Sequence, residues 1–170
     1  MTCEYCEIIE GKGKAEVLYQ DDDLLIVIKG LAVAPGQITI FTKDHQPIIE
    51  MVPDEIIKKC SVMAKKVSIA VFEGLGSLGT NVLVQNGLGA GQKVPHFAIE
   101  IVPRRENDGL NLQWEGKQLE EVDLETTFEA LSKVADEPVK IGGSESSDGS
   151  EEKVIDDKDN YLLKSIKRLP

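Results

Sequence analysis

The stretch Asn81–Arg105 reads NVLVQNGLGAGQKVPHFAIEIVPRR, two strand-like runs joined by a glycine-rich connection. Successive side chains of a strand point to opposite faces, so the second run separates two sets of residues. One face carries the apolar residues Phe97, Ile99 and Ile101. The other face carries His96, Ala98 and Glu100.

Outward from this stretch, short runs bounded by turn residues predict strands, and longer amphipathic runs predict helices. The predicted strands are Ala15–Gln20, Leu24–Ile28, Gln37–Thr42, Asn81–Asn86 and Phe97–Val102. The predicted helices are Asp54–Glu73, with Cys60 on its apolar face, and Asp123–Ala135, whose Leu124, Phe128, Leu131 and Val134 should face inward. The order β-β-β-α-β-β-α with short early links favours an α+β antiparallel meander sheet, with one long helix and a C-terminal helix, over a doubly wound parallel sheet.

Composition limits the classes of protein to which this chain can belong. Its 170 residues carry 19 basic and 30 acidic side chains, a net charge of −11, whereas nucleic-acid binders need a surplus of Lys and Arg. Hydrophobic residues make up 41%, enough for a core, and no run approaches the ~20 apolar residues that span a bilayer. The acidic start MTCEYCEIIE lacks the layout of a secretory signal. We expect a cytoplasmic protein with neither a nucleic-acid nor a membrane partner.

The composition changes near Asp136. Residues 136–160 contain nine acids and three lysines, are rich in Ser and Gly and lack aromatic residues, which predicts an acidic flexible linker after a domain of residues 1–135. Residues 161–170, YLLKSIKRLP, form a short amphipathic peptide. We expect it to dock as a helix on its own domain; binding to a partner or to a membrane surface is the alternative.

Two short motifs carry chemistry in other proteins. The C-x-x-C of Cys3 and Cys6 indicates half a zinc site or a redox pair, and metal is favoured because a thioredoxin-like pair lies between a strand and a helix. Residues 74–79, GLGSLG, match G-x-G-x-x-G, but a predicted helix precedes them and a strand follows. A dinucleotide site needs the reverse order, so we interpret this match as a chance feature of a helix end.

Residues 81–105 resemble the signature of the histidine-triad (HIT) superfamily, in which a strand, an Asn-Gly turn and a Gly-Gln pair lead into His-φ-His-φ-His-φ-φ and Pro-Arg. Upstream, Glu-Val-Leu-Tyr with its acidic turn, Ala-Pro-Gly and Lys43-Asp44-His45 follow the family's order. An N-terminal C-x-x-C occurs in many microbial members. The resemblance covers about Cys3–Ala135 and implies the HIT-like fold.

The resemblance also assigns the triad positions to His96, Ala98 and Glu100. In the family the middle histidine is the nucleophile, which attacks the α-phosphorus and carries the nucleotidyl group. Ala98 has no lone pair for that attack, and Glu100 places an anion where a phosphate would bind. The resemblance therefore implies that this chain has no catalytic residue of the family's kind.

Other positions of the family's nucleotide site are partly changed. Lys29 stands where the family has an acidic ribose-binding residue, and Gln37 replaces a histidine. The positions expected to contact a nucleotide are Lys29, Asn86, Gly91 and Gln92. The opposite sign changes at Lys29 and Glu100 lead to the hypothesis that these side chains pair across the emptied pocket; the alternative is two unrelated surface substitutions.

In the zinc-containing branch of the superfamily, the metal is held by the C-x-x-C, a Lys-x-His histidine and the first triad histidine. The matching positions here are Cys3, Cys6, His45 and His96, which include both histidines of the chain. Two thiolates and two imidazoles form the closed tetrahedral shell of a structural Zn²⁺. The resemblance thus implies structural zinc.

The leading interpretation is a zinc-stabilised HIT-like protein without the nucleophile, which serves as a nucleotide-binding or protein-interaction module with a nucleoside monophosphate as candidate ligand. The resemblance implies a homodimer formed through the long helix and the fifth strand. One alternative is an active nucleotidyl hydrolase or transferase in which Glu100 is the general base for a water molecule. Another is a scaffold whose acidic linker and terminal peptide recruit a partner.

Overall fold

The computed structural model describes residues 3–112 and 114–135, apart from the side chains of Val134 and Ala135. The chain divides into two units, residues 1–117 and residues 118–170. The expected linker at 136–160 and the terminal peptide at 161–170 lie outside the described residues. The predicted domain limit at residue 135 stays a prediction.

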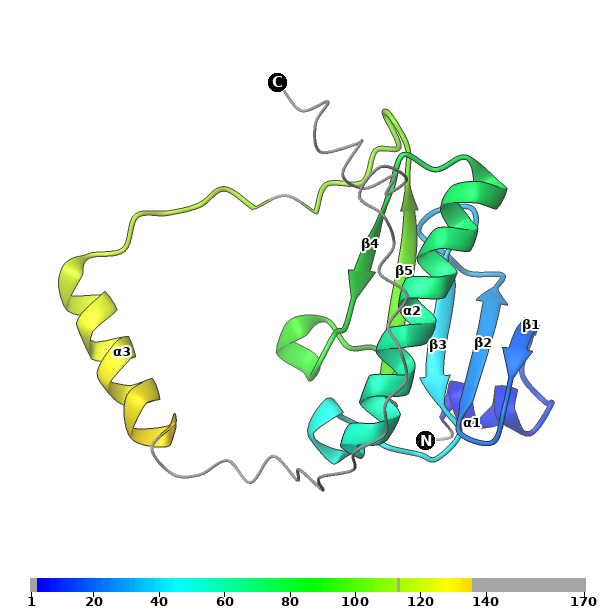
Figure 1. Ribbon diagram of the computed structural model, residues 1–170, viewed down its shortest axis with the longest axis horizontal. Coiled ribbons are helices and arrows are strands. Elements are labelled where there is room, and N and C mark those ends of the chain that lie inside the picture. Colours follow the sequence, from blue (N-terminus) through cyan, green and yellow to red (C-terminus); the bar gives the residue numbers. More distant parts are fainter. Residues whose placement is uncertain (1–2, 113, 136–170) are drawn as a thin grey trace, which may run out of the picture. The chain divides into compact units, whose positions relative to one another are not determined.

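Five strands form one antiparallel sheet in the order β1-β2-β3-β5-β4 (Figure 1). They are β1 (Ala15–Gln20), β2 (Leu24–Lys29), β3 (Ile38–Thr42), β4 (Gly79–Leu83) and β5 (Ala98–Arg104). The helices are α1 (Glu4–Ile9), α2 (Asp54–Leu75) and α3 (Glu121–Ala135), with short 3-10 turns at Ile49–Met51 and Leu88–Ala90. The α+β class with an antiparallel sheet is confirmed, whereas α1 was not predicted.

The strand order departs from the chain order at one place. β1, β2 and β3 form a meander, and α2 then carries the chain to the far edge, so that β5 lies between β3 and β4. Since β5 is hydrogen-bonded on both sides, it has no free edge with which to pair a second copy. β4 supplies that edge, and it ends at Leu83 rather than at the predicted Asn86 because its pairing with β5 ends at Glu100.

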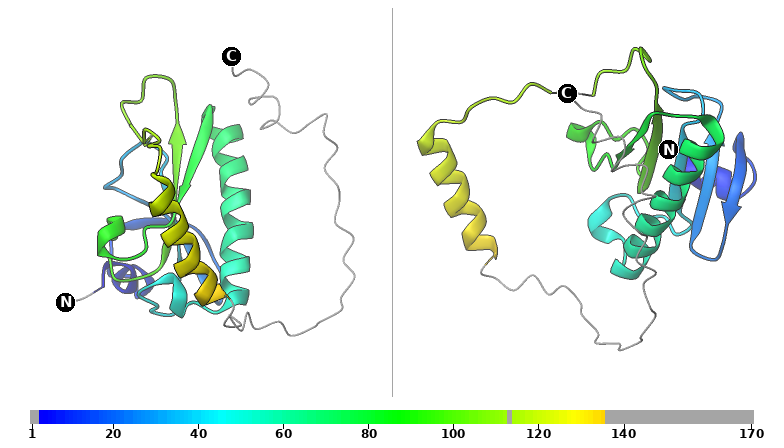
Figure 2. Two further views of the ribbon diagram at one scale, coloured as in Figure 1. Left: turned by 90° about the vertical axis from the view of Figure 1, so that its left-hand side faces the viewer. Right: turned by 45° about the horizontal axis from the view of Figure 1, so that its top comes forward.

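Each face of the sheet has its own apolar core. On one face, residues from β2, β3 and β5 pack against α2, and on the other face they pack against α1 (Figure 2). The α2 core contains Leu24, Ile26, Ile38, Ile40, Cys60, Ala64, Val67, Val71, Phe97, Ile99 and Ile101, among others. The α1 core contains Tyr5, Ile8, Leu25, Val27 and Phe41. The strand period of two therefore directs Lys29, Thr39, Ala98 and Glu100 toward the α1 face.

The ends of α2 follow from its sequence. Pro53 precedes the first turn, which holds Asp54 and Glu55, where acidic side chains favour the helix dipole. Gly76 ends the helix in the left-handed region, with φ 61°, and its N–H donates to the Phe72 carbonyl. The glycine-rich match at 74–79 is thus a helix end followed by β4, as interpreted. In the part of the chain that the structure describes, no helix is long and apolar enough to cross a membrane.

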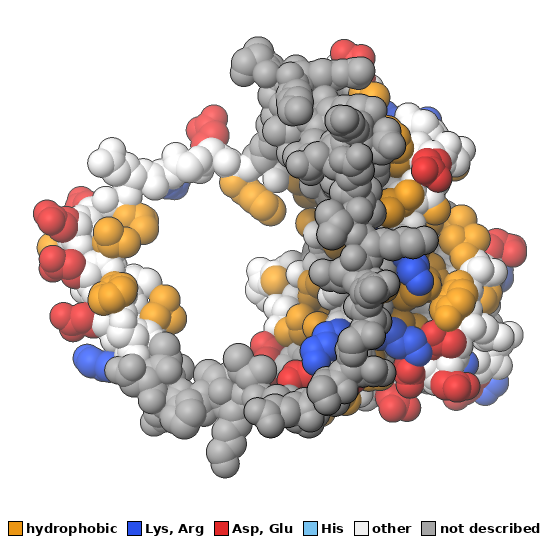
Figure 3. Space-filling view, in the orientation of Figure 1, with side chains coloured by type: hydrophobic (Ala, Val, Ile, Leu, Met, Phe, Trp, Pro, Cys, Tyr) orange, Lys and Arg blue, Asp and Glu red, His pale blue; other side chains and the backbone are white. Residues whose placement is uncertain are grey.

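The second unit contributes α3. Leu124, Phe128 and Leu131, which we expected to face inward, are exposed on this helix, and because α3 belongs to a separate unit their burial stays a prediction. Figure 3 shows apolar side chains on one side of this helix and acidic ones on the other. The amphipathic period forms a helix, but α3 lies in a different unit from the sheet, so the period alone does not bury it.

Candidate metal centre and the adjoining pocket

Four side chains from three parts of the chain converge beside the sheet. Cys3 immediately precedes α1 and Cys6 lies within it, His45 follows β3, and His96 precedes β5. Their donor atoms all lie within 4.8 Å of one another. Residues 93 positions apart in the sequence therefore form one group, as the zinc prediction requires.

Three of the donor separations are close to those of a tetrahedral zinc site, and all of the donor atoms lie within 4.8 Å of one another. His96 Nδ1 lies 3.5 Å from Cys3 Sγ and 3.7 Å from Cys6 Sγ, and His45 Nδ1 lies 3.2 Å from Cys6 Sγ. Ligand bonds of about 2.0–2.3 Å place the donors of a tetrahedral site roughly 3.3–3.8 Å apart. The donor set, two sulfurs and two imidazole nitrogens, is the one that structural zinc prefers.

His96 is oriented for this role by its second nitrogen. Its Nε2 lies 2.8 Å from the Thr42 carbonyl, to which it donates, and this leaves the Nδ1 lone pair directed at the two sulfurs. The side chain is 1% exposed, and burial lowers the pKa of His96, so the imidazole is neutral at pH 7. A neutral imidazole with its other nitrogen engaged is the usual form of a metal ligand.

The Cys6 thiol is harder to ionise here than in water. Burial, followed by the neighbouring Cys3 side chain, raises the pKa of Cys6 and favours its neutral form when no cation is bound. A metal that binds here releases protons and converts the thiols to thiolates. The centre thus has the ligands, the spacing and the orientation for Zn²⁺.

A second cluster surrounds Glu100, on the same face of the sheet. One carboxylate oxygen, Oε2, accepts hydrogen bonds from Gln37 Nε2 and Thr39 Oγ1, both at 2.8 Å. The other, Oε1, accepts from the Tyr5 hydroxyl at 3.2 Å and lies 3.5 Å from Lys29 Nζ. The side chains of Lys29 and Glu100 are only 15% and 17% exposed. The hypothesis that these two residues pair is confirmed.

Tyr5 joins this cluster to the metal centre. Its ring stacks on Phe41, with the centroids 4.5 Å apart, and meets the His96 ring edge-on at 5.6 Å. Lys29 Nζ donates to the Tyr5 hydroxyl at 3.1 Å. Burial and the Glu100 carboxylate raise the pKa of Tyr5, so its hydroxyl stays protonated and can donate.

A cavity of about 300 Å³ lies at the β2–β3 connection. It is lined by Ile28, Lys29, Gly30 and the segment 32–37, which ends at Gln37. Two of the partners of Glu100, Lys29 and Gln37, are therefore part of its wall. Lys29 is the predicted nucleotide contact that lies in this wall, and nucleotide binding there stays a prediction.

The other predicted nucleotide contacts, Asn86, Gly91 and Gln92, lie in the loop between β4 and β5. The polar side chains of Asn86 and Gln92 are hydrogen-bonded within the chain. Asn86 accepts from the Ile49 N–H and donates to Glu50. Gln92 accepts from the Gly87 N–H and donates to the carbonyls of Pro47 and Val94. Gly91 has φ +84°, and a Cβ there would lie 2.8 Å from Gln85 Nε2.

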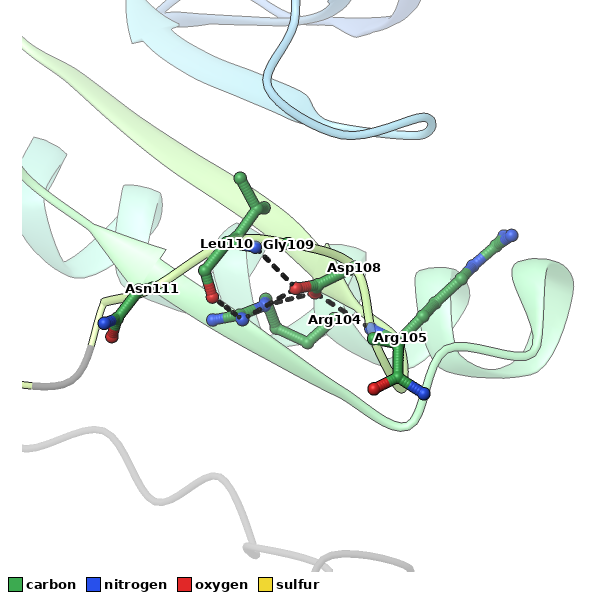
Figure 4. A pocket seen from close by; sticks show the side chains of 7 residues that line it. Arg104, Arg105, Asp108, Gly109, Leu110 and Asn111 are labelled. Carbon is green, nitrogen blue, oxygen red and sulfur yellow. Dashed lines mark hydrogen bonds and ion pairs between the residues drawn. The ribbon is translucent and has the colours of Figure 1, made fainter.

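A larger cavity, of about 510 Å³, lies at the end of β5 (Figure 4). Its polar groups already bond to one another. The Arg104 guanidinium donates to Asp108, to Asn81 Oδ1 and to the Leu110 carbonyl. This ion pair holds the pKa of Asp108 well below its usual range. The contacts of Arg104 and Asp108 therefore stabilise the turn after β5, and these two side chains are not available to bind a ligand in the cavity.

Three residues of the site were missed from the sequence: Tyr5, Thr39 and Thr42. Thr39 lies between Ile38 and Ile40, so strand alternation could have placed it on the face of Glu100. Tyr5 lies between the two cysteines, but no helix was predicted there, so nothing in the sequence indicated that its side chain faces the sheet. Thr42 acts through its backbone carbonyl, for which the side chain gives no signal.

Comparisons with known proteins were made on both sequence and structure. A family model described as HIT domain matches residues 10–107. Adenylylsulfatase HINT3 of Arabidopsis thaliana is 32% identical over 133 residues, which span 78% of this chain and 66% of that protein. Protein hit of Bacillus subtilis is 29% identical over 114 residues, 66% of this chain and 79% of that protein.

Solved structures agree with the fold. A HIT family protein from Bacillus anthracis has a TM-score of 0.70 at 27% identity, covering 78% of this chain and 96% of that one. A zinc-bound histidine triad family protein from Mycobacterium smegmatis has a TM-score of 0.61 at 25% identity, covering 80% of this chain and 97% of that one. This chain is therefore similar in sequence and in fold to proteins of one family.

Proposed function

Since the chain belongs to the HIT domain family, we propose that it is a zinc-stabilised member that binds a ligand or a partner without transferring a nucleotidyl group. The single observation that carries this proposal is the arrangement around β5. The strand presents Ala98, which cannot act as a nucleophile, and Glu100, whose two oxygens are occupied by four partners. This internal anion lies beside the cavity, and two of its four partners, Lys29 and Gln37, belong to the cavity wall.

Structural zinc is the second part of the proposal. It is supported by the spacing of Cys3, Cys6, His45 and His96 and by the zinc-bound mycobacterial relative. When bound, zinc supplies a cross-link between α1 and the segments that flank β3 and β5. We keep the prediction of a cytoplasmic location, because a reduced thiol pair needs a reducing compartment.

Zinc binding is tested by metal analysis of the purified protein and by melting curves with and without a chelator. We expect one zinc per chain and a marked loss of thermal stability after chelation. Cys3→Ser should have the same effect, whereas Cys60→Ser, which alters a thiol outside the centre, should leave the zinc content unchanged. Full zinc content and an unchanged melting temperature in Cys3→Ser would overturn the assignment.

The absence of nucleotidyl transfer is tested with AMP, GMP and a nucleoside phosphoramidate. Titration calorimetry measures whether AMP or GMP binds, and we expect no turnover of the phosphoramidate in either case. Ala98→His/Glu100→His, which restores the family's histidines, is the matched control for the assay. Turnover by the unaltered protein would refute the proposal; binding without turnover would identify a nucleotide-binding module.

The second candidate is a hydrolase with Glu100 as general base, and the adenylylsulfatase name of the Arabidopsis relative favours it. A base needs a free lone pair directed at the attacking water. Here Gln37, Thr39 and Tyr5 donate to the carboxylate and Lys29 lies beside it. These contacts weigh against the hydrolase, and Glu100→Gln would abolish any residual activity if Glu100 were the base.

We also propose a homodimer. The resemblance implied contacts through the long helix and the fifth strand, and because β5 is paired on both sides we propose α2 and the free edge of β4 instead. Apolar side chains are exposed on both: Val62 on α2 is 52% exposed and Val82 on β4 is 50% exposed. An unpaired strand edge is a ready template for pairing with a second chain, and the exposed valines add apolar area beside it. Light scattering after gel filtration should give twice the chain mass, and Val82→Lys should give a monomer. Val17→Lys, which changes a similarly exposed valine on β1 at the opposite edge of the sheet, is the control and should leave the dimer intact.

A further inference from the structure

One short helix belongs to both clusters of the site. α1 contains only Glu4–Ile9, and its two cysteines belong to the metal centre. Between them, Tyr5 is 4% exposed and extends across the sheet face to Glu100 and Lys29. A single residue of the metal-binding helix thus contacts the charged cluster that forms part of the pocket wall.

The helix depends on its contacts for its position. A helix of this length is not stable alone, because the first turn costs more entropy than its few hydrogen bonds return. Cys3 is the N-cap residue, and its side chain makes no capping hydrogen bond. What holds α1 to the sheet is the packing of Tyr5 and Ile8 and the convergence of Cys3 and Cys6 on the two histidines.

The Lys29–Glu100 pair depends in turn on Tyr5. The hydroxyl donates to Glu100 Oε1 and accepts from Lys29 Nζ, so it bridges two groups that lie 3.5 Å apart. The Lys29 ammonium also lies 4.8 Å from the centre of the Tyr5 ring, over its face. If α1 moves away, both charges lose the hydroxyl that bridges them, and Lys29, then held by Glu100 alone, turns more readily into the cavity or to solvent.

We propose that Tyr5 couples the metal centre to the pocket: a metal bound by Cys3, Cys6, His45 and His96 holds Tyr5 on the Lys29–Glu100 pair, and loss of the metal releases Lys29. Metal occupancy then regulates the charge that the 300 Å³ cavity presents to a ligand. This inference rests on the metal site proposed above. Coupling between two sites is reciprocal, so a change at Tyr5 must also alter metal affinity.

The test measures the acylation of Lys29 by an amine-reactive ester, with peptide mass spectrometry, in zinc-loaded and chelated protein. Zinc content is determined first, so a failure of metal binding is seen separately from a failure of the coupling. Alkylation of Cys60, which is buried on α2, reports global unfolding in the same samples. The variants are Tyr5→Phe, which keeps the ring and removes the hydroxyl, and Tyr19→Phe as the matched control on β1.

In the unaltered protein and in Tyr19→Phe, chelation should raise the acylation rate of Lys29 about fivefold or more while Cys60 stays protected. Tyr5→Phe should acylate rapidly in both states and bind zinc roughly fivefold more weakly in competition with a chromophoric chelator. Equal Lys29 rates with and without zinc would overturn the inference. So would a parallel rise at Lys29 and Cys60, or a Tyr5→Phe variant that responds to zinc as the unaltered protein does.

Discussion

Replacing Lys29 by Met removes the only charged partner of Glu100 among the described contacts while keeping a side chain of similar length. The carboxylate stays 17% exposed and keeps its hydrogen bonds from Gln37, Thr39 and Tyr5, so the loss is smaller than for a bare buried charge. Breaking a buried pair costs about 3–5 kcal/mol, and the remaining donors reduce this to about 2–3 kcal/mol. For a chain of this length the melting temperature should fall by about 4–12 °C.

The assay is thermal and urea unfolding of the zinc-loaded protein at pH 7, arranged as a double-mutant cycle with Glu100→Gln. Since each single change leaves a partner unsatisfied, Lys29→Met/Glu100→Gln should cost about 1–2 kcal/mol less than the sum of the singles. Lys58→Met, which breaks an exposed pair with Glu55, is the control and should change stability by less than about 0.5 kcal/mol. Strictly additive losses, or a Lys29→Met protein as stable as the original, would refute the reasoning.

Three further predictions concern other parts of the structure. Partial burial alone would raise the pKa of Asp21, but hydrogen bonds from two backbone N–H groups and from Lys59 outweigh it and hold the pKa well below its usual range. The Asp21 carboxylate therefore stabilises the fold above pH 4, and this stabilisation is lost as the pH falls. Asp21→Asn should therefore cost about 1–2 kcal/mol at pH 7 and much less at pH 2, as measured by urea unfolding; an equal cost at both pH values would contradict this. Burial raises the pKa of Cys60 to about 11, so at pH 8 its alkylation should be about 100-fold slower in native than in urea-unfolded protein, and equal rates would show that it is not buried. Gly36 has φ +85°, in the left-handed region, and a Cβ there would also push aside the end of the half-exposed Leu75 side chain. Gly36→Ala should therefore lower stability by about 1–2 kcal/mol in the same unfolding assay, and an unchanged midpoint would be inconsistent with this turn.

The Glu100 cluster beside the pocket and the candidate metal centre differ in whether their polar side chains already have partners within the chain. At the metal centre, the side chains present their donor atoms to one another with the spacing of a ligand shell. At the pocket, the donors and acceptors around Glu100 are satisfied within the chain. This contrast is why we propose that the scaffold remains while the nucleotidyl chemistry does not.

The local pattern predicted most of the secondary structure because strand and helix periods are properties of neighbouring residues. β1 has the predicted limits, and β2 and α2 differ by one or two residues at their ends. β4 begins and ends earlier in the chain than the predicted strand Asn81–Asn86, because its limits are set by pairing with β5 rather than by its own β-branched residues. α1 was not predicted because its six residues span fewer than two helical turns, which is too short for a helical hydrophobic period to be recognised.

The amino-acid sequence by itself determined the fold class and the face on which Glu100 lies, and the family resemblance pointed to the four candidate ligands of the proposed metal centre. Only the tertiary structure decided that β5 is central, that Lys29 meets Glu100 and that Tyr5 joins them to the cysteines. The physical reason is the range of the interactions. Periodicity and turn chemistry act within a few residues, whereas Tyr5 and Glu100 are 95 positions apart and meet only because the sheet brings α1 and β5 to the same face.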